Sequence, residues 1–127
     1  MGMRLPIILS AILLSGCALL PTPFDSALYD HVVSLSATVD SISKNCGEPG
    51  MTNDVEMLNF QSKVIVKYTE FTSKDVHQSV ALVDKAITEM NNAYSVGTPS
   101  TAYCKLKLQI VDGELHEILT GIGGKQK

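Results

Sequence analysis

The chain has 127 residues, enough for one small domain, and a formal net charge of −3. Nucleic acids and anionic lipid surfaces bind clustered Lys and Arg, and only the C-terminal Lys125-Gln126-Lys127 offers such a cluster, so neither is expected as a partner. Tryptophan is absent and only 6% of residues are aromatic, which leaves little for platforms that stack on sugars or bases.

Residues 1–16 have the three parts of a bacterial export signal. Arg4 is the positive charge of a short leading region, and an apolar run follows at residues 5–14. This run is too short to cross a hydrocarbon layer of about 30 Å as a helix. Ser15 and Gly16 then supply the small residues that a signal peptidase requires. The pattern favours a cleaved signal peptide over a transmembrane anchor or a buried helix.

Leu14-Ser15-Gly16-Cys17 resembles the lipobox of bacterial lipoproteins, in which small residues precede an obligatory cysteine. The resemblance covers the signal peptide only. It implies cleavage before Cys17 and acylation of Cys17, and several acyl chains together hold a protein stably on a membrane. Ala18 stands where Asp is associated with inner-membrane retention in enteric bacteria. The resemblance therefore implies the periplasmic side of the outer membrane rather than the inner membrane or the cell surface.

Residues 17–24 are expected to form the lipidated N-terminus and a tether, because two prolines in this stretch resist helix formation. The first helix is predicted to begin with Asp25 or Ser26 as its N-cap. Its apolar residues alternate four and three apart, which places them on one side of a helix. They are Leu28, Val32, Leu35, Val39 and Ile42. Cys46 continues the series and is followed by a glycine that ends the helix. The alternating Val-Ser and Ser-Ala pairs in this segment leave a β-strand as the alternative.

Two further helices are predicted between residues 52 and 95. Asn53 and Glu56 form a capping box for the first of them, whose apolar stripe is broad and irregular. This stripe contains Met57, Leu58, Val64, Ile65, Tyr68 and Phe71. Residues 72–75 form a second capping signature at which the apolar series changes phase, so we expect a break there rather than one unbroken helix. The next helix, ending at Gly97, has the series Val76, Val80, Val83, Ile87, Met90 and Tyr94.

The last helix is predicted to begin at Thr98 and Pro99, which combine a cap with a proline suited to the first helical position. Its apolar series is Cys104, Leu108, Val111, Leu115, Ile118 and Ile122. Gly113 weakens this helix by about 1 kcal/mol relative to alanine. The bundle domain is therefore predicted over residues 25–122, with residues 123–127 as a flexible tail.

The cysteines support a fold of four helices. If Cys17 is acylated, Cys46 and Cys104 remain as an even pair in an oxidising compartment. In an antiparallel four-helix bundle the first helix ends where the last begins, so the two cysteines meet, whereas one unbroken central helix would hold them apart. The predicted fold is all-α, a small antiparallel four-helix bundle stapled by a Cys46–Cys104 disulfide. Two free thiols are the alternative.

His31, His77 and His116 fall near the tether end of such a bundle, but His116 is expected to point outward. The spacing of metal-binding motifs is absent, as are a nucleophile elbow and a glycine-rich phosphate loop, so we predict no metal site, no cofactor and no enzyme. Glu114 and Glu117 form an i, i+3 pair that is expected on an exposed face, whereas a catalytic pair needs a cleft.

The expected membrane anchor and the lack of such motifs together predict a protein-interaction or structural module of the cell envelope. Such a module would act in assembly, exclusion or secretion with another envelope protein. Tyr29, Val33, Phe60 and Tyr103 lie off the apolar series and form the candidate contact surface, which would also permit a homodimer. The alternative is a ligand- or metal-binding bundle that senses envelope conditions. A hydrolase would require a pocket with an activated serine or paired carboxylates.

Overall fold

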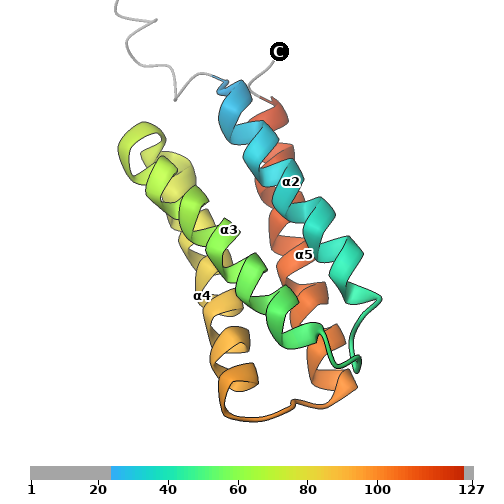
Figure 1. Ribbon diagram of the computed structural model, residues 1–127. Coiled ribbons are helices and arrows are strands. Elements are labelled where there is room, and N and C mark those ends of the chain that lie inside the picture. The colour runs from blue at the N-terminus through green and yellow to red at the C-terminus, as the bar shows by residue number, and fades with distance from the viewer. Residues whose placement is uncertain (1–23, 125–127) are drawn as a thin grey trace, which may run out of the picture.

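A computed structural model describes residues 24–124. Within this range the chain forms four α-helices and no strand: α2 (Ser26–Ser43), α3 (Met51–Thr72), α4 (Lys74–Val96) and α5 (Thr101–Gly124). The helices run antiparallel in chain order (Figure 1), which confirms the predicted all-α four-helix bundle. Cys17, with the predicted signal peptide, lies outside the described residues.

Each helix of the bundle packs against two neighbours, with α2 and α4 both lying between α3 and α5. The start of α2, the α3–α4 turn and the end of α5 share one end of the bundle (Figure 1). We call it the tether end, because the chain enters the bundle there at Asp25. The α2–α3 and α4–α5 connections lie at the opposite, distal end (Figure 1).

The core is built from the apolar series predicted for α2, α4 and α5. Alternate steps of four and three residues keep these side chains on one side of each helix, facing the bundle axis. Except for Val76, which is half-buried, every member of the three helical series is at most 7% exposed. The buried members are Leu28, Val32, Leu35, Val39, Ile42, Val80, Val83, Ile87, Met90, Tyr94, Cys104, Leu108, Val111, Leu115, Ile118 and Ile122.

The stripe predicted for α3 is wrong in part, because two of the core positions of this helix are polar. Its buried residues are Met51, Val55, Leu58, Ser62, Ile65 and Thr69. The hydroxyl of Ser62 donates to Asp84 Oδ1 on α4 at 2.7 Å, and Thr69 Oγ1 is hydrogen-bonded to His77 Nδ1 at 3.0 Å. Burying a hydroxyl costs little free energy when it keeps a hydrogen bond. Polar partners on α4 therefore turn Ser62 and Thr69 inward.

The N-terminus of α2 confirms its predicted cap, since the Asp25 carboxylate accepts a hydrogen bond of 3.1 Å from the N–H of Leu28. The strand alternative for this segment is thus wrong. The start of α3 was predicted at Asn53, but the helix begins at Met51 without a side-chain cap. A single residue, Ser73, separates α3 from α4, so the predicted break is confirmed and the unbroken helix is excluded.

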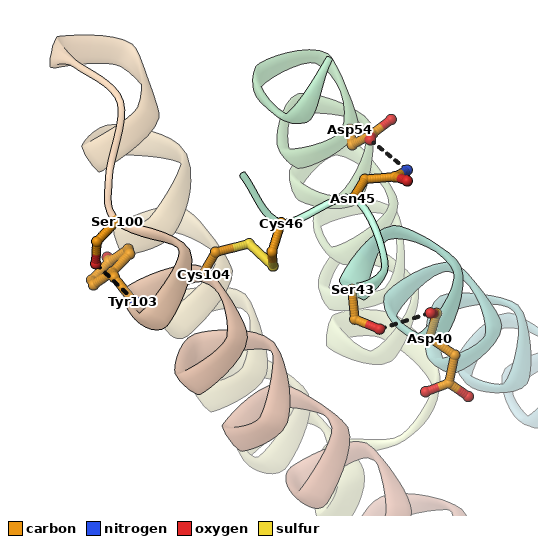
Figure 2. Close-up of a disulfide and its surroundings, with 8 residues drawn as sticks. All are labelled: Asp40, Ser43, Asn45, Cys46, Asp54, Ser100, Tyr103 and Cys104. Atoms are coloured by element: carbon orange, nitrogen blue, oxygen red, sulfur yellow. Dashed lines mark hydrogen bonds between the residues drawn. A yellow bond between two sulfur atoms is a disulfide. The ribbon is translucent and has the colours of Figure 1, made fainter. Parts of the chain in front are cut away.

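The last helix starts and ends later than predicted. Ser100, not Thr98, caps it by accepting a hydrogen bond of 3.1 Å from the N–H of Tyr103 (Figure 2). The helix then continues to Gly124 instead of ending at Ile122.

A disulfide closes the distal end (Figure 2). Cys46, in the turn after α2, is bonded to Cys104 in the first turn of α5, with the two Cα atoms 5.7 Å apart. This confirms the predicted pairing over two free thiols. Gly47 beside it has φ +92° and lies so close to α5 that an added Cβ would be 2.7 Å from Thr101 Oγ1. The turn therefore needs glycine for its backbone angle and for space.

Removing the disulfide should lower the free energy of unfolding by about 4 kcal/mol. The bond joins residues 58 positions apart and so restricts the unfolded chain, which gains conformational entropy when the bond is lost. Urea denaturation of a Cys46→Ala/Cys104→Ala variant measures this, in a Cys17→Ala background that excludes thiol exchange. Reduction of the Cys17→Ala protein is the matched control and should give a similar loss without changing the core. A loss below about 1 kcal/mol in both experiments would contradict the role given to the bond.

Ser62→Ala should lower the free energy of unfolding by about 1–2 kcal/mol, because Asp84 loses a buried donor and keeps only its contact with Lys63. Ser41→Ala on the exposed side of α2 is the control, since both substitutions bring the same gain in helix propensity. Thermal and urea unfolding of the two variants give the comparison. Equal stabilities for the two would show that the inward hydroxyl contributes nothing.

Candidate functional site

An exposed row of large apolar side chains runs along α3. Met57, Phe60, Val64 and Phe71 are 45%, 70%, 39% and 77% exposed. Their spacing of three, four and seven residues places them on one helix face, beside the core positions but outside the bundle. The Lys67 ammonium lies 6.0 Å from the centre of the Phe71 ring and bridges the gap in the row. We call these four apolar residues the outer row; several exposed apolar side chains on one face are typical of interaction sites.

A shallow groove of about 140 Å³ lies beside the outer row, between α2 and α3. Phe60 and Val64 form one wall, and His31 and Ser34 of α2 form the other. The Oε1 atom of Gln61 is buried there without a hydrogen-bond donor among the described residues. A buried acceptor without a donor costs about 1–3 kcal/mol. Because this atom is buried, a docked partner could reach it only if the Gln61 side chain turned outward.

Polar contacts with α4 fix the rotation of α3 about its axis. Lys63 Nζ lies 3.2 Å from both carboxylate oxygens of Asp84 and 3.2 Å from Thr88 Oγ1. Thr88 in turn donates to Asn59 Oδ1 at 3.2 Å. Because these bonds lie on the α4 side of α3, they keep the outer row facing away from α4. The surface is thus preformed, which lowers the ordering cost of binding.

The tether end holds a small network that joins the start of α2 to α3. The Tyr68 hydroxyl donates to Asp25 Oδ2 at 2.7 Å, and the His31 ring lies 5.6 Å from the Tyr68 ring. This hydrogen bond lowers the pKa of Asp25 below its ordinary value, with further help from the N–H of Leu28, and raises the pKa of Tyr68. Asp25 therefore serves as both the cap of α2 and its link to α3.

The four residues of the predicted contact surface do not share one face. Tyr29 and Val33 are one turn apart on the side of α2 towards α5, where a Cβ added at Gly123 would lie 3.7 Å from the Tyr29 ring. Tyr103 is partly buried at the distal end, and only Phe60 belongs to the outer row. The other members of the row were missed because their apolar character had assigned Met57, Val64 and Phe71 to the core stripe.

The three histidines contact different residues and do not contact one another. His31 is exposed against Tyr68, His77 bonds to Thr69, and His116 is exposed 3.9 Å from Asp112. Among residues 24–124, no group of three or more His, Cys, Asp or Glu side chains is placed to hold a metal ion. None of the helices in the same range combines the length and hydropathy needed to cross a membrane.

No family model, curated protein or solved structure matches the chain. The surfaces of the bundle itself are therefore the guide to its function.

Tyr68→Phe should raise the pKa of Asp25 towards its ordinary value, because the carboxylate loses its hydroxyl donor. A lowered folded-state pKa stabilises the protein above the unfolded-state value, about 3.9, and this contribution disappears as the pH falls through the folded-state pKa. The variant should thus be less stable than wild type at neutral pH and match it in acid. Carboxyl NMR titration and pH-dependent urea unfolding test both points.

The matched control is Tyr29→Phe, because Tyr29 packs against the ring of Phe24, at 5.8 Å between centroids, rather than on Asp25. It should leave the Asp25 titration unchanged. A normal Asp25 pKa in the wild-type protein would contradict the network.

Proposed function

We propose that the protein is a lipid-anchored interaction module of the cell envelope. In this proposal it is acylated at Cys17, stands on the periplasmic side of the outer membrane and binds another envelope protein through the outer row of α3. The observation that carries the proposal is this row, which places four exposed large apolar side chains on one helix, with Phe60 and Phe71 at 70% and 77% exposure. The lipobox resemblance and the disulfide, a bond typical of oxidising compartments, support the location.

The chemistry of the row suits a protein partner. Aromatic side chains and methionine are enriched at interface cores and supply much of the binding free energy there. Phe60 adjoins the groove whose other wall carries His31 and Ser34, so an apolar contact and polar groups of α2 lie side by side. Lys67 at 75% side-chain exposure and Glu70 at 50% supply polar groups along the same helix.

The position of the row suits an anchored protein. Phe71 lies one residue before the end of α3 at the tether end, and Met57 lies towards the distal end (Figure 1). With the tether next to the membrane, the row would run outward from the membrane surface along the side of the bundle. A partner that is itself fixed in the envelope could then bind alongside.

A ligand-binding sensor of envelope conditions is the second candidate, favoured by a groove of about 460 Å³ between α4 and α5. Under that function, a small envelope molecule would raise the melting temperature of the purified protein, and the outer row would contact nothing.

The test is site-specific photo-crosslinking in intact cells, with benzoylphenylalanine in place of Phe60. The matched control carries it in place of Leu106, which is 58% exposed on α5, away from the row. We expect one stoichiometric crosslinked envelope protein from position 60, none from position 106, and loss of the product in a Cys17→Ala background. Phe71→Ser should reduce the yield.

Equal crosslinking from both positions, or none from position 60, would refute the proposal. A product with twice the mass of the chain would show instead that the row joins two copies in a homodimer.

A further inference from the structure

A groove of about 460 Å³ lies between α4 and α5 near the tether end. Val76, Ile118 and Ile122 form an apolar floor, and Leu82 stands on its edge at 62% exposure. Gly121 leaves part of the wall open, since a Cβ added there would have no neighbour within 4 Å. The groove is on the opposite flank of α4 from α3, so it is separate from the outer row.

Carboxylates line the sides of this groove. Glu114 and Glu117 project from α5, and Asp75 from the first turn of α4. The expectation that Glu114 lies on an exposed face is wrong: it is half-buried, and its Oε2 atom is buried without a donor among the described residues. Burial raises the pKa of Glu114, and the neighbouring charge of Glu117 adds to the effect.

The charge of Lys107 on the same helix opposes this rise in the pKa of Glu114, but the Lys107 ammonium is hydrogen-bonded elsewhere. Lys107 Nζ bonds to Glu89 Oε2 at 2.9 Å, and this bond lowers the pKa of Glu89. The groove therefore combines an apolar floor with a side that carries the carboxylates of Glu114 and Glu117.

We propose that this groove binds a basic, apolar peptide segment of a partner protein. The segment's Lys or Arg would bond to Glu114 and Glu117, while an adjacent apolar side chain would lie on Val76 and Ile118. The inference rests on the proposed interaction function and deepens it by naming the chemistry of the partner. It concerns a different face from the outer row, so the two can be tested separately.

Other occupants fit this chemistry less well. Anionic lipid headgroups and phosphates would be repelled by the carboxylates. A purely apolar ligand would cover the carboxylates of Glu114 and Glu117 and supply no cation to pair with them. A bare metal ion would leave the apolar floor uncovered, and residues 24–124 offer no group of three ligands to hold one. A cation attached to an apolar chain satisfies both parts of the groove.

The test measures fluorescence anisotropy of a short fluorescein-labelled peptide of alternating leucine and lysine, added to the purified full-length Cys17→Ala protein in neutral detergent. Gly121→Leu places a leucine side chain in the wall of the groove, where an added Cβ has no neighbour within 4 Å. Gly113→Leu is the matched control: it too adds leucine at an open glycine of α5, but this position does not line the groove. Glu114→Gln removes the charge while keeping the shape. Comparison peptides replace lysine by glutamate, or leucine by serine.

We expect Gly121→Leu to raise the Kd of the leucine–lysine peptide at least about tenfold, Glu114→Gln to raise it about threefold or more, and Gly113→Leu to leave it unchanged. Both comparison peptides should bind more weakly. Equal binding by all variants, no binding at all, or equal binding of the glutamate peptide would overturn the inference. So would concentration-dependent self-association that Gly121→Leu abolishes, because the occupant would then be a second copy. If the peptide measurements contradict the groove inference while position 60 still crosslinks to one envelope protein, the proposed function stands and only the groove inference has failed.

Discussion

The disulfide joins α2 to α5, two helices that are not consecutive in the chain. Helices joined by short turns come together readily, as α3 and α4 do across Ser73, but α2 and α5 are the first and last helices of the bundle. Cys46 and Cys104 hold them together at the distal end, and the Gly47 turn permits the close approach. With α2 fixed on α5, the remaining pair completes a square arrangement, and each apolar series faces the others.

The sequence was sufficient for most of this architecture because three of the four helices bury apolar residues only at regular positions. It was insufficient for α3, where two parallel rows compete: one contains Ser62 and Thr69, and the other contains Met57, Val64 and Phe71. Apolar periodicity favours the second row. The choice is made by Asp84 and His77 on α4, and nothing within the sequence of α3 reveals these partners.

The same limitation applies to the candidate sites. The spacing along each helix indicated that Phe60, Glu114 and Glu117 lie outside the core. It did not indicate which side of each helix a neighbouring helix covers. Packing of α4 against α5 converts a pair of carboxylates expected in solvent into one side of a groove, while bonds from α4 to Lys63 turn the apolar face of α3 outward. The two surfaces thus differ in chemistry, since the outer row is apolar and the groove has an acidic side, and they lie on different helices of the bundle.

The position of the disulfide also determines how the bundle would respond to mechanical load. A bundle pulled between its N-terminus and the C-terminal end of α5 takes up tension first at the start of α2, at the end of the molecule opposite the bond. Tension could peel α2 from its neighbours as far as Cys46, but the covalent link passes the load directly to α5. The segment between the cysteines, including all of α3 and α4, would therefore be shielded from extension. Both proposed binding surfaces lie wholly or partly on that shielded segment.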